Sequence, residues 1–321
     1  MKIPFFKTTV TGEEIKYLQQ VLTGSDSFAN KTFVTKCENW FHENHQVKNF
    51  FLTKSCTDSL ELAALMLNIN EGDEIILPSY SFVSCGNAFA LFGAKCVFVD
   101  ILPDTMNIDE TKIEAAITTR TKAIVTLNYA SAACNYDAIR NIARKNNLYI
   151  IEDNAHGILA EYKKGKYLGQ FGDIATFSFD HLKNVSCGQG GGIAINNEDL
   201  LQSFFVHYEF GTNRRSFFNG NANRYEWKNL GSNYPLSELN AAMLFAQLEN
   251  AEKINAKFVQ FVSLYSELLS DLRKDDKIDF PDISKEGKQN GHCFFIKAKD
   301  LTERNDLIKF LHDREINAQF H

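Results

Sequence analysis

The chain has 321 residues, of which 44% are hydrophobic, so it is long enough to bury a large core. Its formal net charge of -6 argues against nucleic acid or an anionic membrane as the main binding partner. The seven cysteines are scattered and form no CxxC pair, which argues against a zinc site or a disulfide framework and indicates reduced thiols in a cytoplasmic protein.

Apolar runs and helical periodicity alternate along the first two thirds of the chain. This alternation predicts an α/β fold, in which helices cover both faces of a mostly parallel sheet. In chain order, the predicted elements are helix 59–69, strand 73–78, helix 81–93, strand 95–101, helix 107–117 with Asn107 as its N-cap, strand 121–129, helix 137–148 and strand 149–156.

The last third of the chain has a different pattern of apolar and polar residues. A loop-like stretch, 211–235, precedes a long helical pattern over 237–272, and a further helix is predicted within 302–316. We therefore predict a large domain over 1–249 and a smaller α+β domain over 250–321. The final residues, 316–321, read as a strand, which leads us to expect that the smaller domain is incomplete. No leader sequence and no membrane span are predicted.

Polar side chains stand at the ends of three predicted strands, namely Tyr80, Asn128 and Asp153. The carboxyl ends of parallel strands meet at one edge of a sheet, so these side chains could converge. A carboxylate such as Asp153, which follows a buried strand, could hold a protonated ring nitrogen, and His156 lies three residues further on. The alternative interpretations are a helix cap for the aspartate and a structural role for the histidine.

Two further stretches carry possible chemistry. In "TKSCTDSLELAAL" (53–65) the N–H groups at a helix start, with the hydroxyls of Ser55 and Thr57, could bind a phosphate, although an ordinary N-cap fits as well. In "FSFDHLKNVSCGQGGG" (177–192) Lys183 is either a solvated charge or a buried amine that can form a Schiff base. The glycines after it permit close backbone approach but match neither GxGxxG nor a P-loop.

Taken together and in this order, these stretches resemble one family. "PSYSFVSCGNAFALFGAKCVFVDILPDTMNID", "FSFDHLKN" and "LGSNYPLSELNAAMLFAQLE" are similar to the DegT/DnrJ/EryC1/StrS nucleotide-sugar aminotransferases, which are pyridoxal 5'-phosphate enzymes of the aspartate aminotransferase fold. Within the family the resemblance is strongest to the dTDP-4-amino-4,6-dideoxygalactose transaminase group. It implies a three-layer large domain with a mixed, mostly parallel sheet, followed by a smaller α+β domain.

The resemblance also implies an activity. The expected reaction moves an amino group from L-glutamate to a nucleotide-linked 4-keto-6-deoxy sugar, with dTDP-4-keto-6-deoxyglucose as the expected acceptor. Such a reaction would serve polysaccharide biosynthesis, for example of lipopolysaccharide. No metal is implied.

The resemblance assigns roles to eight residues by position. Lys183 would be the Schiff-base lysine, Asp153 would pair with the pyridinium nitrogen, and His156 would bond the phenolic oxygen. Phe82 would stack on the ring, while the backbone at Thr57 and Asp58 and the hydroxyl of Ser178 would hold the phosphate. Asn233 matches a residue that reaches the cofactor phosphate of a neighbouring subunit, which implies a homodimer with shared active sites.

Several positions depart from the family pattern. Asp58 stands where a small residue is usual, and Asn128, Ser131, Asp180 and Gln189 replace His, Gly, His and Glu. These changes leave two alternatives open, a transaminase for another keto sugar nucleotide and a degenerate homologue that binds ligand or dimerises. The related dehydratases carry histidine in place of the lysine, so Lys183 argues against that branch. Family members also continue for about 50 residues beyond the position of His321.

Overall fold

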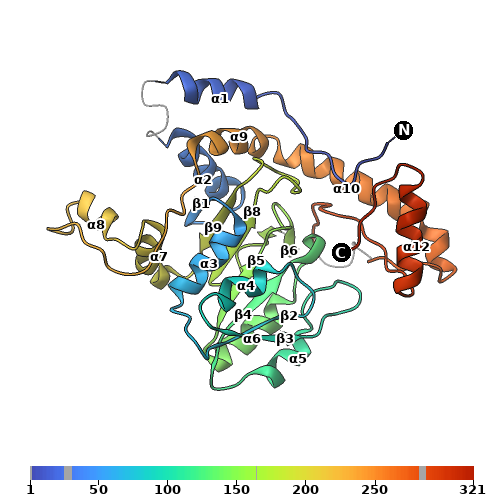
Figure 1. Cartoon of the computed structure of the whole chain (residues 1–321), viewed down its shortest axis with the longest axis horizontal. Coiled ribbons are helices and arrows are strands. Elements are labelled where there is room, and N and C mark those ends of the chain that lie inside the picture. Colours follow the sequence, from blue (N-terminus) through green and yellow to red (C-terminus); the bar gives the residue numbers. More distant parts are fainter. Residues whose placement is uncertain (1, 25–30, 164, 282–286) are drawn as a thin grey trace.

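The computed structural model describes residues 2–24, 31–163, 165–281 and 287–321 (Figure 1). Its centre is a seven-stranded sheet in the order β1-β9-β8-β5-β4-β2-β3. Only β9 runs against the other strands of this sheet, so the prediction of a mixed, mostly parallel sheet is confirmed. The strands are β1 (Phe50–Thr53), β2 (Glu74–Pro78), β3 (Lys95–Val99), β4 (Thr121–Leu127), β5 (Tyr149–Asp153), β8 (Ile174–Ser178) and β9 (Gly191–Ile195).

Helices cover both faces of the sheet, because successive side chains of a strand point to opposite faces. On β2, Ile75 and Leu77 pack against α3 and α4, whereas Ile76 packs on the other side with α5 and α6. The helices of this part are α1 (Glu14–Thr23), α2 (Thr32–Asn44), α3 (Cys56–Met66), α4 (Ser84–Ala90), α5 (Glu110–Ala116), α6 (Tyr136–Asn146), α7 (Leu201–Tyr208) and α9 (Glu238–Leu248). A short hairpin, β6 (Glu161–Lys163) and β7 (Lys166–Tyr167), stands apart from the sheet.

The helical stretch predicted over 237–272 is not one helix. α9 ends at Leu248, α10 spans Ala251–Leu268, and α11 (Ser270–Lys274) follows after Leu269. At the first break Asn250 has φ -115° and ψ 9°, and its side-chain amide donates to the carbonyl of Ala246 at 3.1 Å. The apolar pattern continues across the break, so periodicity alone does not reveal it.

Two other predicted details are wrong. Asp109 caps α5 by accepting from Thr111 N, whereas Asn107 is buried and accepts from Tyr129 N at 2.9 Å. Residues 316–321 form no strand, since only Ile316 makes an isolated bridge, with Ile3.

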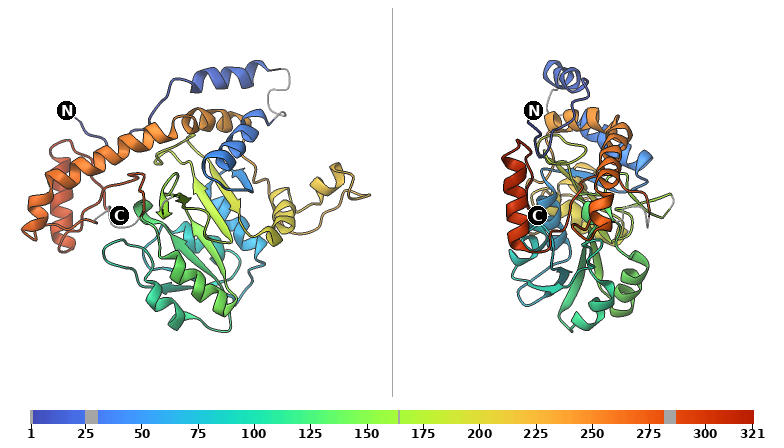
Figure 2. Two further views of the ribbon diagram at one scale, coloured as in Figure 1. Left: turned by 180° about the vertical axis from the view of Figure 1, so that it is seen from behind. Right: turned by 90° about the vertical axis from the view of Figure 1, so that its right-hand side faces the viewer.

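The segments after β9 extend to two opposite ends of the molecule (Figures 1 and 2). The stretch 211–235 carries a short helix, α8 (Arg214–Phe218), and projects away from the sheet at one end. α10 leads to the other end, where it lies beside α12 (Leu301–His312). α10 begins directly after the predicted domain boundary at 249, and that boundary stays a prediction. Within the described part of the chain, no helix combines the length and the apolar character that crossing a membrane requires.

Candidate active site

The carboxyl ends of β5 and β8 bring several of the predicted site residues together. Asp153 ends β5 and Ser178 ends β8, and these strands are neighbours, with Asp153 in register with Thr176. Lys183 follows in a turn in which its backbone N–H donates to Asp180 O at 2.9 Å. The positive charge of Lys183 acts on the pKa of six nearby side chains, which are Asp153, His156, Cys56, His292, Cys293 and His321.

Asp153 is a buried carboxylate whose own chain supplies only weak stabilisation. Its side chain is 4% exposed; Oδ1 accepts from Ala155 N at 3.0 Å, and Oδ2 accepts from the Cys85 thiol at 2.9 Å. Burial raises the pKa of Asp153, against the lowering effect of these bonds and of Lys183. A buried carboxylate of this kind favours a cationic partner, such as a protonated ring nitrogen.

The start of α3 forms a cradle of backbone N–H groups. Ser55 is its N-cap and accepts from Asp58 N at 3.0 Å, while the Ser55 hydroxyl donates to the Asp58 carboxylate at 2.6 Å. The N–H groups of Cys56 and Thr57 make no hydrogen bond to any described residue, as expected for the first turn of a helix. They can therefore bind an anion at the positive end of the helix dipole. Asp58 keeps its carboxylate on Ser55 by this capping bond.

Gly191 is the one position of the glycine run 188–192 at which close contacts to the start of α3 require glycine. It lies in register with Ser178 on one side and Thr53 on the other. A Cβ atom at Gly191 would lie 2.2 Å from the carbonyl carbon of Ser55 and 2.4 Å from Cys56 N. Glycine is therefore required for β9 to approach the start of α3. Gly188 has a different reason to be glycine, since its φ is +82° and its surroundings are open.

His156 lies beside the lysine in a defined tautomer. Its Nδ1 accepts from Ala130 N at 3.3 Å, so neutral His156 carries its proton on Nε2. Burial, and then the nearby basic side chains, lower the pKa of His156, so the ring is neutral near pH 7. The ring stacks on His292, with centroids 4.0 Å apart. Sequence reasoning missed His292, because no motif or spacing links it to Lys183.

Two other predicted site residues are Phe82 and Asn233. Phe82 precedes α4, and its carbonyl accepts from the N–H of Cys85, the residue that contacts Asp153; its ring is 65% exposed. Asn233 pairs with Glu209 at the base of the projecting 211–235 segment. No described contact joins Asn233 to Lys183. Within one chain, the structure thus brings together Lys183, Asp153, His156, Ser178 and the start of α3.

The residues that depart from the family pattern have structural partners of their own. Buried Asn128 donates to Glu152 and Asn154, and its oxygen accepts from the Tyr136 hydroxyl at 2.8 Å. Asp180 accepts from Leu182 N within the turn that carries Lys183. These contacts give Asn128 and Asp180 structural roles in this chain.

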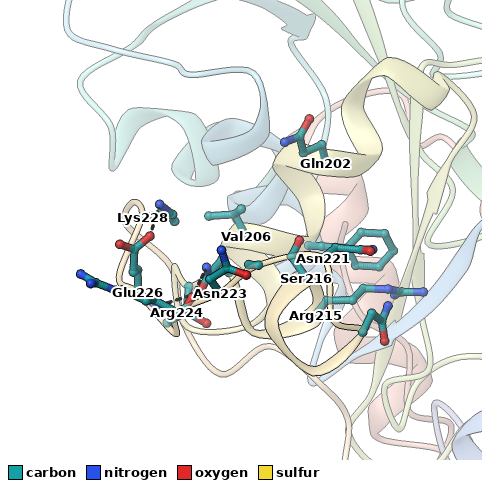
Figure 3. A pocket seen from close by; sticks show the side chains of 14 residues that line it. Gln202, Val206, Arg215, Ser216, Asn221, Asn223, Arg224, Glu226 and Lys228 are labelled. Carbon is teal, nitrogen blue, oxygen red and sulfur yellow. Dashed lines mark hydrogen bonds and ion pairs between the residues drawn. The ribbon is translucent and has the colours of Figure 1, made fainter.

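A cavity of about 750 Å³ lies elsewhere, between α7 and the 211–235 segment (Figure 3). Amide and guanidinium side chains line it, among them Arg215, Asn221, Asn223 and Arg224. None of the predicted site residues contributes to this lining.

The sequence profile of the DegT/DnrJ/EryC1/StrS aminotransferase family matches residues 8–321. The chain belongs to this family. Among curated proteins it is 32% identical to the GDP-perosamine synthase of Escherichia coli O157:H7, over 99% of this chain and 84% of that protein. Among solved structures it resembles PseC of Helicobacter pylori, an aminotransferase of pseudaminic acid biosynthesis, with a TM-score of 0.90 and 25% identity over 100% of this chain and 85% of the other.

Members of this family are pyridoxal-phosphate-dependent sugar aminotransferases, and the described residues fit that cofactor. Spr1654 of Streptococcus pneumoniae, whose structure is known in a pyridoxal phosphate form, shares the fold, with a TM-score of 0.88 and 22% identity over 99% of this chain and 84% of the other. In this chain the unpaired N–H groups of Cys56 and Thr57 suit a phosphate, and the buried Asp153 carboxylate suits a pyridinium nitrogen. Lys183 lies close enough to Asp153 for its charge to affect the pKa of that carboxyl.

Proposed function

We propose that this enzyme transfers an amino group from L-glutamate to a nucleotide-linked 4-keto-6-deoxy sugar. The first acceptor to consider is dTDP-4-keto-6-deoxyglucose, as for a dTDP-4-amino-4,6-dideoxygalactose transaminase. The observation that carries this proposal is the convergence of Lys183, buried Asp153 and the open start of α3 at the carboxyl ends of β5 and β8.

In the proposed mechanism Lys183 has two tasks. Its Nζ would hold the cofactor covalently, and as a free amine it would carry a proton to and from the reacting carbon. Bound pyridoxal phosphate supplies an electron sink for the carbon that loses its proton. Asp153 would keep the ring nitrogen protonated, which would strengthen that sink.

The remaining residues orient the cofactor. Neutral His156 would donate from Nε2 to the phenolic oxygen, a role that its tautomer supports. The N–H groups at the start of α3, around Thr57 and Asp58, would hold the phosphate together with the Ser178 hydroxyl. Thr57 N–H makes no hydrogen bond to any described residue, whereas Asp58 N–H is bonded to Ser55. Phe82, exposed in the single chain, would stack on the ring face.

We further propose a homodimer in which Asn233 completes the site of the partner subunit. The support is the projecting 211–235 segment, together with large apolar side chains that a single chain leaves in water. These include Phe82, Val83, Leu91, Phe98 and Trp227.

The test is amine transfer from glutamate to dTDP-4-keto-6-deoxyglucose, with the amino sugar identified by mass spectrometry. A GDP-linked 4-keto-6-deoxy sugar is the second candidate acceptor, because the E. coli relative is a GDP-perosamine synthase. Product with either sugar, dependent on Lys183, supports the proposed function. Cofactor binding without transfer to any keto sugar nucleotide would instead favour a homologue that has lost catalysis.

A further inference from the structure

Three buried asparagines form a network directly beside Lys183. Asn184, Asn255 and Asn290 are 3%, 6% and 1% exposed. The Asn184 amide donates to Asn255 Oδ1 at 2.9 Å and to the backbone oxygen of Asn290 at 3.0 Å. Because both acceptors are oxygens, these two bonds fix which end of the Asn184 amide is nitrogen. The Asn184 oxygen must therefore face the other way.

That oxygen faces His292. Asn184 Oδ1 lies 2.9 Å from His292 Nδ1. An amide oxygen can only accept, so Nδ1 of His292 carries the proton. Burial, and then the positive charge of Lys183, lower the pKa of His292, so the ring is neutral and its Nε2 holds a lone pair.

The same network fixes the position of His292. Asn290 Oδ1 accepts from His292 N at 2.9 Å, and the Asn290 amide donates to the backbone oxygens of His156 and Ile158. The His292 ring stacks on His156, which is the opposite tautomer. The stacked pair therefore offers one donor, His156 Nε2, and one acceptor, His292 Nε2. No described residue makes a hydrogen bond to His292 Nε2, and the ring is only half-buried.

We propose that His292 is a substrate-binding residue of this site and that its Nε2 accepts a hydrogen bond from a hydroxyl of the acceptor sugar. This inference rests on the proposed function. Once the amine of glutamate has reacted, only carboxylates remain on the donor, and a carboxylate is an acceptor that a lone pair repels. A sugar offers hydroxyl donors. His292 thus contributes to the second half of the reaction and not to the first.

The two halves can be measured separately on the holoenzyme by stopped-flow absorbance. Glutamate bleaches the band of the lysine-bound cofactor, and dTDP-4-keto-6-deoxyglucose restores it from the amine-loaded form. The variant His292→Phe keeps a ring that can stack on His156 but lacks both nitrogens. His42→Phe, an exposed site on α2, is the matched control.

The expected result for His292→Phe is bleaching by glutamate within about threefold of the wild-type rate. The apparent Kd for the sugar should rise about 10- to 100-fold, as for loss of a buried hydrogen bond. His42→Phe should change neither half. Sugar analogues that each lack one ring hydroxyl identify the group that is bonded. One of them should bind the wild type more weakly than the parent sugar does. The same analogue and the parent sugar should bind His292→Phe equally well.

Other outcomes would overturn the inference. Equal sugar affinity in wild type and His292→Phe would contradict it while leaving the proposed function intact. Equal damage to both halves would assign His292 a structural role instead. If wild type is bleached by glutamate but no keto sugar nucleotide restores the band, the proposed function fails, and the inference fails with it.

Discussion

Asp58 places a carboxylate next to the N–H groups that we assign to the cofactor phosphate. The structure ties that carboxylate to the Ser55 hydroxyl, so it acts as a cap of α3. The capping bond turns it toward Ser55 but does not remove its charge. A like charge a few ångströms from a phosphate costs about 1 kcal/mol in a well-hydrated site and more as water is excluded.

We predict that Asp58→Asn binds pyridoxal phosphate about 5- to 10-fold more tightly, because the amide removes this repulsion and keeps an oxygen for the Ser55 hydroxyl. Cofactor titration followed by absorbance measures the affinity. Pyridoxal, which lacks the phosphate, is the control ligand and should bind both proteins alike. Unchanged affinity for pyridoxal phosphate would show that the charge of Asp58 does not repel the cofactor phosphate.

At the scale of single residues, the strand-end pattern predicted Asp153, whereas Ser178 was assigned by the family resemblance alone. Asp153 and Ser178 stand at strand ends, where parallel topology gathers functional groups. His292 could not be predicted in this way. Its place beside Lys183 depends on three asparagines from separate segments.

At the scale of elements, the contact between β9 and the start of α3 determines whether the phosphate cradle forms. We predict that Gly191→Ala abolishes cofactor binding and lowers the free energy of unfolding by about 3 kcal/mol or more, since the new Cβ would overlap the Ser55 and Cys56 backbone. Chemical denaturation and cofactor titration measure the two effects.

Gly188→Ala is the matched control within the same run. It should cost only about 1 kcal/mol, for the strain of a positive φ, and should leave the cofactor affinity unchanged. If both variants behave alike, the close approach of β9 to α3 is not what the glycine run provides.

The edge of the sheet carries a pH-dependent contact. Within the described sheet β1 pairs with β9, and Thr53 of β1 also makes an isolated bridge to Pro235. The Leu52 backbone hydrogen-bonds the Glu38 side chain of α2, and the Leu52 carbonyl accepts from the Tyr208 hydroxyl at 2.5 Å. These contacts cover an edge that would otherwise stay open to pairing. Burial raises the pKa of Glu38 from 4.5 to about 7.

Because the folded pKa of Glu38 lies above the unfolded one, the stabilising contribution is complete below pH 4.5 and is lost as the pH rises through 7. We predict that wild type loses stability relative to Glu38→Gln by about 3 kcal/mol over this window. Urea unfolding of both proteins at pH 5 and pH 8 measures the difference. A difference that does not vary with pH would mean that Glu38 is ionised in the folded protein throughout.

The alternation of strands and helices was predictable because parallel strands buried on both faces are continuous apolar runs between amphipathic helices. The breaks around α10 were not, because Asn250 and Leu269 interrupt the helix without interrupting the apolar pattern. The strand expected at 316–321 does not form. Its apolar residues pair at Ile316 alone, in a bridge to Ile3.

At the scale of the whole molecule, the homodimer that we propose would cover the projecting 211–235 segment and the apolar side chains that the single chain exposes. Asn233 lies at the base of that segment and has no described contact with Lys183 of its own chain. A shared site across a two-fold axis would bring the two residues together, one from each subunit.

Complementation tests this arrangement. Lys183→Ala and Asn233→Ala should each be nearly inactive as homodimers, but a heterodimer of the two has one intact site. We predict that an equal, co-refolded mixture recovers roughly a quarter of wild-type activity, as random pairing gives half heterodimers with one good site each. Activity no greater than that of the separate variants would mean that Asn233 does not complete the site of the partner subunit.

The proposed function depends on covalent attachment of pyridoxal phosphate to Lys183, between Asp153 and the start of α3. The most direct measurement is the absorbance spectrum of the protein with added pyridoxal phosphate, beside Lys183→Ala. We predict a visible band at roughly 400–430 nm in wild type, bleached by glutamate, and no such band in the variant. Borohydride reduction should fix the cofactor mass on the peptide that contains Lys183. A band of equal intensity in both proteins, or none in either, would contradict the account.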